Sequence, residues 1–145
     1  QHTYDLPLPL NDDSYNFSFS GLKSAVINLC HNAAQRGEDI VPADLACSFQ
    51  EVALDVLVSK TIKAAKDYQV KEIIVAGGVS ANRGLRKKLT ADSPIKVLFP
   101  PMAYCTDNAA MIASAARVMY EHQQFSSLDL SVKPSYDLEE ESIGE

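Results

Sequence analysis

The sequence predicts an α/β fold in which helices flank a small mixed sheet. Two short apolar runs, 73–76 and 96–99, indicate strands, and helical patterns alternate with them. The first run is almost uniformly apolar, which is typical of a parallel strand covered on both faces. A pair of glycines or prolines follows each run, at Gly77 and Gly78 and at Pro100 and Pro101, and such pairs commonly end strands.

The first half of the chain predicts one further strand and two helices. Aromatic and polar residues alternate over 15–20, which indicates a short strand with Phe17 and Phe19 on one face. Apolar residues at helical spacing then predict a helix over about 21–36 and a longer one over about 42–68. The second helix ends in a run of lysines, which we interpret as a solvated face near its carboxyl end: Lys60, Lys63, Lys66 and Lys71.

The second half predicts strands and helices in alternation. Strand 73–76 is followed by a helix over about 82–89, and strand 96–99 by a helix over about 109–123. The last helix is rich in small residues, which would let its backbone pack closely on the sheet. Two or three strands make a thin sheet with open edges, and strands upstream of this chain would cover them.

The composition indicates one soluble domain spanning 1–145, with a mobile tail over 135–145. No apolar run approaches the ~18 residues that a membrane span requires, and the amino end lacks the features of a signal peptide. We therefore expect a cytoplasmic protein without a membrane partner. The chain opens on Gln1 rather than Met, in a loop-like segment with Pro7 and Pro9, which indicates a fragment.

The charge distribution leaves two interpretations open for one basic cluster. The net charge of -6 argues against an autonomous nucleic-acid binder, because neutralisation of phosphates supplies most of that affinity. The densest basic cluster follows the glycine pair, where it could contact phosphate or RNA or form a solvated helix face. Its members are Arg83, Arg86, Lys87 and Lys88.

The first candidate site is the loop from Gly77 to Asn82. In open α/β sheets, ligands bind beyond the carboxyl ends of the strands, and this loop stands at such an end. Gly77 and Gly78 permit positive φ and close backbone approach, and the following helix offers unpaired N–H groups to an anion. The alternative is structural, since two glycines commonly end a strand, and Ser80 or Asn82 would suit a helix cap.

The second candidate site is the Cys-Thr-Asp-Asn stretch at 105–108, which follows the second strand and also precedes a helix. If the two strands are neighbours, both loops face one crevice. Thr106 and Asp107 also suit ordinary helix caps, and spacing alone favours capping over a metal or catalytic role.

Other reactive residues point to no complete site. Cys30, Cys47 and Cys105 are too widely spaced for a disulfide framework or a paired zinc site, so we expect reduced core residues. The histidines lack the spacing of a metal-binding pair, and no serine stands in a nucleophile elbow.

Three segments, in order, closely resemble the carboxyl-terminal half of the TsaD family, the tRNA N6-adenosine threonylcarbamoyltransferases, also known as Gcp or O-sialoglycoprotein endopeptidases. They are FSFSGLKSAV at 17–26, VAGGVSANRGLR at 75–86 and PPMAYCTDNAAMIA at 100–113. The likeness extends over about 6–138. The three motifs in this order are more specific than any one of them.

The resemblance implies an actin-like ATPase fold of the sugar kinase and heat-shock type, with a nucleotide held between two lobes. This chain would be the carboxyl-terminal lobe. The family's glycine-rich segment lines the nucleotide site, which implies contacts from Gly77, Gly78 and Asn82 to ATP or threonylcarbamoyl-adenylate. Its acidic motif implies that Asp107 ligates a divalent metal, iron or zinc.

The reaction implied by the resemblance is transfer of a threonylcarbamoyl group from its adenylate to N6 of the adenosine beside the tRNA anticodon. The implied partners are tRNA, a TsaB-like paralogue and a TsaE-like ATPase, with self-association of the fragment as another possibility. The family's histidine metal pair and early phosphate loops would precede Gln1, so we expect this chain alone to be inactive. A metal-dependent glycoprotease and a binding or assembly module without catalysis are the alternatives.

Overall fold

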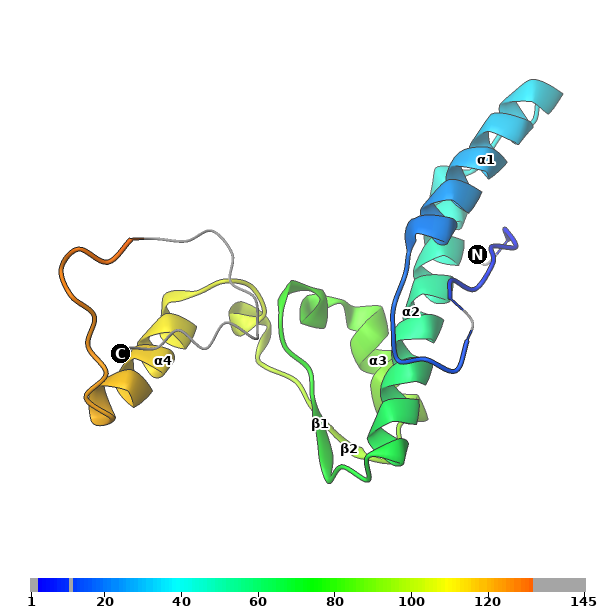
Figure 1. Cartoon of the computed structure of the whole chain (residues 1–145). Coiled ribbons are helices and arrows are strands. Elements are labelled where there is room, and N and C mark those ends of the chain that lie inside the picture. The colour runs from blue at the N-terminus through cyan, green and yellow to red at the C-terminus, as the bar shows by residue number, and fades with distance from the viewer. Residues whose placement is uncertain (1–2, 11, 132–145) are drawn as a thin grey trace. The chain divides into compact units, whose positions relative to one another are not determined.

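The computed structural model describes residues 3–10 and 12–131 of the chain (Figure 1). These residues fall into two compact units, which divide between Thr106 and Asp107. The elements of the first unit are α1 (Ser20–Arg36), α2 (Pro42–Asp67), β1 (Glu72–Ile74), α3 (Arg83–Asp92) and β2 (Lys96–Leu98). The second unit contains α4 (Ala109–Glu121).

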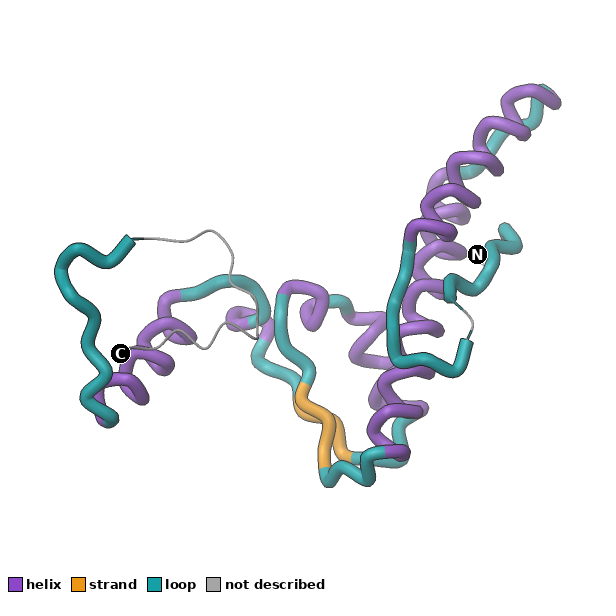
Figure 2. Tube along the Cα trace, viewed as in Figure 1, coloured by secondary structure: helices purple, strands orange, loops and turns teal. Residues whose placement is uncertain are grey.

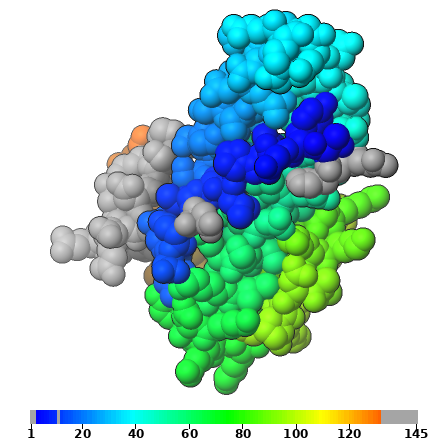
Figure 3. Space-filling view, turned by 90° about the vertical axis from the view of Figure 1, so that its right-hand side faces the viewer, coloured from blue at the N-terminus to red at the C-terminus, as the bar shows by residue number. Residues whose placement is uncertain are grey.

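Helices α1 and α2 have nearly the predicted bounds and pack together through an apolar cluster. The buried centre of this cluster is Leu6, Leu22 and Val52, so the amino-terminal segment contributes to it as well. Figure 3 shows this segment lying against the two helices, and the hydroxyl of Ser48 accepts hydrogen bonds from two of its backbone N–H groups. Helix α1 ends at Arg36 and is capped by Gly37, whose φ of 68° is the left-handed conformation that glycine adopts without strain.

A second apolar cluster joins α2, α3 and the sheet. Its buried members are Leu54, Val58, Leu85 and Leu89, and side chains from the strands and their carboxyl ends pack against it. The apolar residues of α2 therefore serve two clusters on different sides of the helix. This arrangement fixes α3, and hence the loop that precedes it, against the sheet.

The sheet of the described residues consists of β1 and β2 alone, which pair in parallel and lie side by side in Figure 2. The expected parallel pairing is confirmed, and the two strands are neighbours, as the shared crevice requires. The described residues add no antiparallel strand that would make this sheet a mixed one. The expected cover on both faces is also wrong within this sheet. Ile74 and Leu98 lie opposite each other and are 72% and 36% exposed.

The predicted strand over 15–20 is wrong. The segment forms no strand and α1 already begins at Ser20. Carbonyl groups around the start of this segment point to α2 instead of to a neighbouring strand, because Lys60 donates hydrogen bonds to those of Ser14 and Asn16. Alternation of side chains predicts a strand only where a second strand can pair with its backbone, and none of the described residues provides one.

Helix α4 begins after Asn108, whose side-chain oxygen accepts a hydrogen bond from the N–H of Met111 at 3.0 Å. None of its residues is buried. Its packing on the sheet therefore stays a prediction, as does the single domain over 1–145. The proposed mobile tail at 135–145 lies outside the described residues. Among the helices of 3–10 and 12–131, none is long and apolar enough to cross a membrane.

Candidate nucleotide-binding loop and metal ligand

The glycine loop starts shortly after β1 and leads directly into α3. Gly77 has φ 85° and ψ 173°, a conformation open essentially to glycine alone. A 3-10 turn over Gly78–Ala81 follows, in which the N–H of Ser80 donates to the carbonyl of Gly77. Asn82 then starts the helix. The strand, the turn and the helix together fix the course of the loop.

The fold requires a glycine at position 77 but gives no reason for one at position 78. A β-carbon added at Gly77 or at Gly78 would meet no atom within 4 Å. Gly77 is nonetheless required by its backbone conformation, whereas Gly78 has no positive φ. The described fold thus explains the first glycine and leaves the second unexplained. Close approach of a ligand is one reason for a glycine at such a position.

Asn82 caps α3, as the structural interpretation predicted. Its Oδ1 accepts a hydrogen bond from the N–H of Leu85 at 3.0 Å, and its Nδ2 donates to Oε1 of Gln50 at 3.3 Å. Capping does not use up the side chain, because a carboxamide has two N–H donors and an oxygen with two lone pairs. The nucleotide contact of Asn82 therefore stays a prediction, as do those of the glycines.

Ser80 carries a buried hydroxyl that lacks a partner. The residue is 1% exposed, and its Oγ makes no hydrogen bond within the described part of the chain. Buried polar groups in proteins are nearly always paired, so each exception needs an explanation. Pairing of this hydroxyl therefore requires a water, a ligand or a group outside residues 3–10 and 12–131.

The second loop buries its cysteine and exposes its aspartate. Cys105 is 2% exposed at the end of the first unit, and Asp107 is an exposed residue at the start of the second. The prediction that Thr106 or Asp107 caps the last helix is wrong, because Asn108 does so. The Asp107 carboxylate has no hydrogen-bond partner among the described residues, which leaves its oxygens available to a ligand.

Arg86 links the two loops within the first unit. Its guanidinium donates to the carbonyl of Ser80 at 2.6 Å, to that of Pro100 at 2.6 Å and to Sγ of Cys105 at 3.2 Å. The guanidinium also lies over the ring of Phe99, 5.0 Å from its centroid. Arg86 is therefore neither a solvated residue nor a free phosphate ligand, and the cluster interpretation is wrong for it.

The other members of the basic cluster divide between pairing and exposure. Lys88 forms ion pairs with Asp55 at 2.8 Å and with Asp92 at 3.4 Å. Arg83 and Lys87 are exposed on α3. For these two residues, the interpretation as a solvated helix face agrees with the structure.

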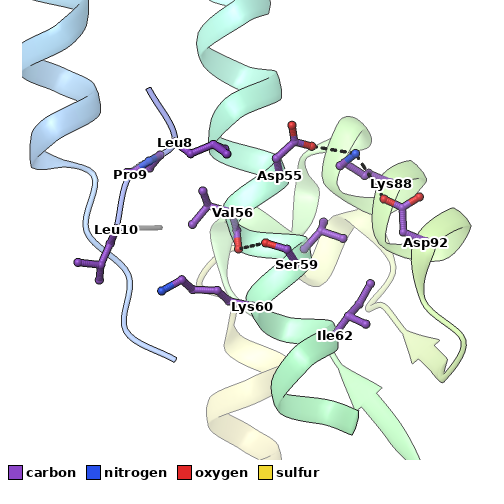
Figure 4. A pocket seen from close by; sticks show the side chains of 11 residues that line it. Leu8, Pro9, Leu10, Asp55, Val56, Ser59, Lys60, Ile62, Lys88 and Asp92 are labelled. Carbon is purple, nitrogen blue, oxygen red and sulfur yellow. Dashed lines mark hydrogen bonds and ion pairs between the residues drawn. The ribbon is translucent and has the colours of Figure 1, made fainter. Parts of the chain in front are cut away.

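A hollow of about 510 Å3 lies between the amino-terminal segment, α2 and α3 (Figure 4). Its cations already have partners, since Lys88 forms the pairs just described and Lys60 donates to Asp12 at 2.7 Å. Most of the remaining lining is apolar, with Leu8 and Ile62 on opposite sides. The hollow therefore lacks the convergent unpaired polar groups of a typical ligand site.

The described residues contain no group of three or more His, Cys, Asp or Glu side chains that could hold a metal. The metal role of Asp107 therefore stays a prediction, and the described residues supply no complete site around it. The cysteines are free thiols, but Cys30 is exposed on α1, so the prediction of a core position is wrong for it. His122 faces the carbonyl of Val118 at the end of α4.

Sequence reasoning missed two packing residues near the site. Lys60 is 7% exposed and holds the amino-terminal segment, so the solvated-face interpretation is wrong for it. Gly84 lets α3 approach α2, because a β-carbon there would lie 2.9 Å from Cδ1 of Leu54. The apolar neighbours of Lys60 in the helical pattern gave a signal for its burial, whereas nothing in the pattern marked Gly84.

These features define a small α/β protein in which two loops follow neighbouring parallel strands. A sequence model of the family "TsaD: tRNA N6-adenosine threonylcarbamoyltransferase" matches residues 1–114. The chain therefore belongs to the TsaD family.

Proteins named tRNA N6-adenosine threonylcarbamoyltransferase are similar to almost the whole chain. The one from Bacillus thuringiensis (strain Al Hakam) is 53% identical over 142 residues, covering 94% of this chain and 41% of the relative. The one from Halalkalibacterium halodurans is 53% identical over 133 residues, covering 90% and 39%. That from Bacillus subtilis is 51% identical over 141 residues, covering 92% and 41%. The chain thus spans less than half the length of the curated relatives it matches.

Proposed function

We propose that this chain forms the carboxyl-terminal part of an enzyme that transfers a threonylcarbamoyl group to tRNA. The donor is threonylcarbamoyl-adenylate, and the acceptor is N6 of the adenosine beside the anticodon. The observation that carries the proposal is the 53% identity to relatives that bear the name of this transferase. The conformation of the glycine loop supports it, because its open glycine positions leave room for a ligand.

The fold of the complete enzyme is proposed to be the two-lobed, actin-like ATPase fold, with this chain in the carboxyl-terminal lobe. Its two parallel strands with a helix between them are compatible with such a lobe. The exposed Ile74 and the unpaired Ser80 hydroxyl support a larger protein, since both are features that neighbouring structure normally covers or satisfies.

Gly77, Gly78 and Asn82 are proposed to bind the nucleotide. Gly77 turns the chain out of the strand, and Gly78 keeps the surface of the turn low enough for a ligand to lie on it. Asn82 holds the start of α3 with its oxygen, while one N–H of its carboxamide remains to donate to the ligand. The residues therefore bind and orient the adenylate, so that its mixed anhydride is held in one position for attack.

Asp107 is proposed to hold a divalent metal, iron or zinc, as one ligand of a site whose other ligands lie outside the described residues. A bound metal would polarise the carbonyl of the threonylcarbamoyl group, which helps because an exocyclic adenine amine is a poor nucleophile. The donor type fits, since an exposed carboxylate without a partner among the described residues offers oxygen lone pairs.

The proposed partners are tRNA, a TsaB-like paralogue and a TsaE-like ATPase, in the cytoplasm. The net charge of -6 supports a shared tRNA surface, because an acidic chain gains little from phosphate contacts of its own. A partner with basic surface would supply the missing attraction.

The test is tRNA modification by the complete gene product, meaning this chain with everything its gene encodes before and after it. Threonylcarbamoyl transfer is measured on unmodified tRNA with the purified partners present. We expect Asp107→Ala to lower the rate by at least about tenfold. Asp39→Ala, which removes an exposed carboxylate between α1 and α2, serves as the control and leaves the rate unchanged.

The remaining outcomes separate the alternatives. Equal transfer by wild type and Asp107→Ala would remove the metal role of Asp107. Cleavage of a glycoprotein by the complete gene product, without transfer to tRNA, would support the glycoprotease alternative. Association with the partners without either reaction would support an assembly module.

A further inference from the structure

Arg86 is the residue of α3 that contacts both the glycine loop and the loop after β2. It is a half-buried residue on α3, and its guanidinium contacts the backbone that follows each of the two parallel strands. On one side it binds the carbonyl of Ser80 in the glycine loop. On the other it binds the carbonyl of Pro100 and the thiol of Cys105, which belong to the loop after β2.

The contacts use the features that distinguish arginine from lysine. The planar guanidinium spreads its donors over a fork, so one side chain reaches three acceptors at the same time. Both carbonyl contacts are short, at 2.6 Å, as hydrogen bonds from charged donors tend to be. Stacking on Phe99 holds the plane of the guanidinium, which leaves it little freedom to move elsewhere.

We propose that Arg86 is a positioning residue that clamps the glycine loop to the segment 100–105, which leads to Asp107. The inference rests on the proposed function for the roles of the two loops. Arg86 acts through the backbone of Ser80 and Pro100 and the thiol of Cys105, which are its hydrogen-bond partners in the structure. Its removal therefore weakens nucleotide binding and metal retention together, because both loops lose the same anchor.

The test compares three variants of the complete gene product. Arg86→Met removes the fork and keeps an unbranched apolar stem, and Arg86→Lys keeps the positive charge without the fork. Arg83→Met is the matched control, because Arg83 is an exposed arginine on the same helix. Affinity for ATP is measured by calorimetry, and bound iron or zinc by elemental analysis after loading and dialysis.

We expect Arg86→Met to lower both ATP affinity and metal retention by about 10- to 100-fold, as the loss of residues that orient metal ligands commonly does. Arg86→Lys should restore neither, because an ammonium group cannot span the three acceptors. Arg83→Met should leave both unchanged. A loss confined to one of the two ligands, or values for Arg86→Met within about twofold of wild type, would overturn the clamp.

Hydrogen exchange distinguishes a clamp from a general role in folding. In Arg86→Met, backbone amides over 77–82 and 100–105 should exchange faster, while amides of the α2–α3 core keep their protection. Faster exchange throughout the core would overturn the proposal. If the wild-type protein binds no nucleotide, the proposed function fails, and exchange at the two loops still decides whether Arg86 joins them.

Discussion

At the scale of single residues, the two adjacent glycines of the glycine loop should respond differently to the same substitution. Gly77→Ala places a side chain at φ 85°, which we expect to cost about 1–3 kcal/mol of unfolding free energy. Gly78→Ala adds a β-carbon where nothing lies within 4 Å, so its unfolding free energy should stay within about 0.5 kcal/mol of wild type. Urea unfolding of the two variants provides the measurement, and equal losses would contradict the assigned conformations.

A second residue-scale prediction concerns the contact of α3 with α2. Gly84→Ala would bring a β-carbon to 2.9 Å from Leu54 and to 3.1 Å from the capping oxygen of Asn82. We expect it to cost about 1–3 kcal/mol of unfolding free energy, because the buried side chain of Leu54 and the capping side chain of Asn82 must shift. Gly21→Ala is the control in α1, where nothing lies within 4 Å and alanine should not destabilise the helix. A neutral Gly84→Ala in thermal unfolding would show that the helices do not approach so closely.

At the scale of elements, one lysine of α2 fixes the segment before α1. Lys60 donates to the carboxylate of Asp12 at 2.7 Å, and this hydrogen bond lowers the pKa of Asp12 below its ordinary value. The contact therefore stabilises the fold at neutral pH and loses its effect as the pH falls below about 4, where the carboxylate takes up a proton.

Lys60→Met should raise the pKa of Asp12, measured by NMR titration of its carboxyl carbon. Lys63→Met is the matched control on the same helix. Lys63 pairs with Asp67 at 2.8 Å and lowers the pKa of that carboxyl group, so its loss should move the pKa of Asp67 and leave that of Asp12 unchanged. An Asp12 that titrates identically in wild type and Lys60→Met would contradict the contact.

The helices and the two parallel strands could be predicted from local patterns, because their apolar spacing matches the faces they bury. The glycine loop and its capping Asn82 could also be located, because two glycines commonly end a strand and asparagine commonly caps a helix. The failed strand over 15–20 shows the limit, since alternation says nothing about whether a second strand lies beside it. Lys60 shows a second limit of local patterns. Its burial depends on three acceptors that lie 44–48 positions away, on Asp12, Ser14 and Asn16.

The sequence could place the candidate site residues on loops, but it could not predict their contacts. The resemblance to the family indicated Gly77, Asn82 and Asp107, yet the bridge made by Arg86 depends on the pairing of β1 with β2. A basic residue in a helix pattern gives no sign of such a bridge. The residue that caps α4 could not be predicted either. Thr106, Asp107 and Asn108 are all suitable caps, and only the structure identifies Asn108.

At the scale of the whole molecule, the open sheet should make the isolated chain self-associate. Ile74 and Leu98 expose apolar surface on neighbouring strands. We expect the molecular mass in sedimentation equilibrium to rise with concentration, and Ile74→Lys to weaken this association by at least about tenfold. Ile27→Lys, an equally apolar loss on α1, is the control. An isolated chain that stays monomeric would contradict this use of the sheet.

The proposed function depends most on a nucleotide lying against the loop that ends in Asn82. Its most direct test is the ATP affinity of the complete gene product carrying Asn82→Ser. Serine keeps a capping oxygen for α3, so stability should change by less than about 1 kcal/mol, while the carboxamide N–H donors are lost. The proposed function predicts an ATP affinity at least about tenfold weaker with the fold intact. An unchanged affinity would contradict it.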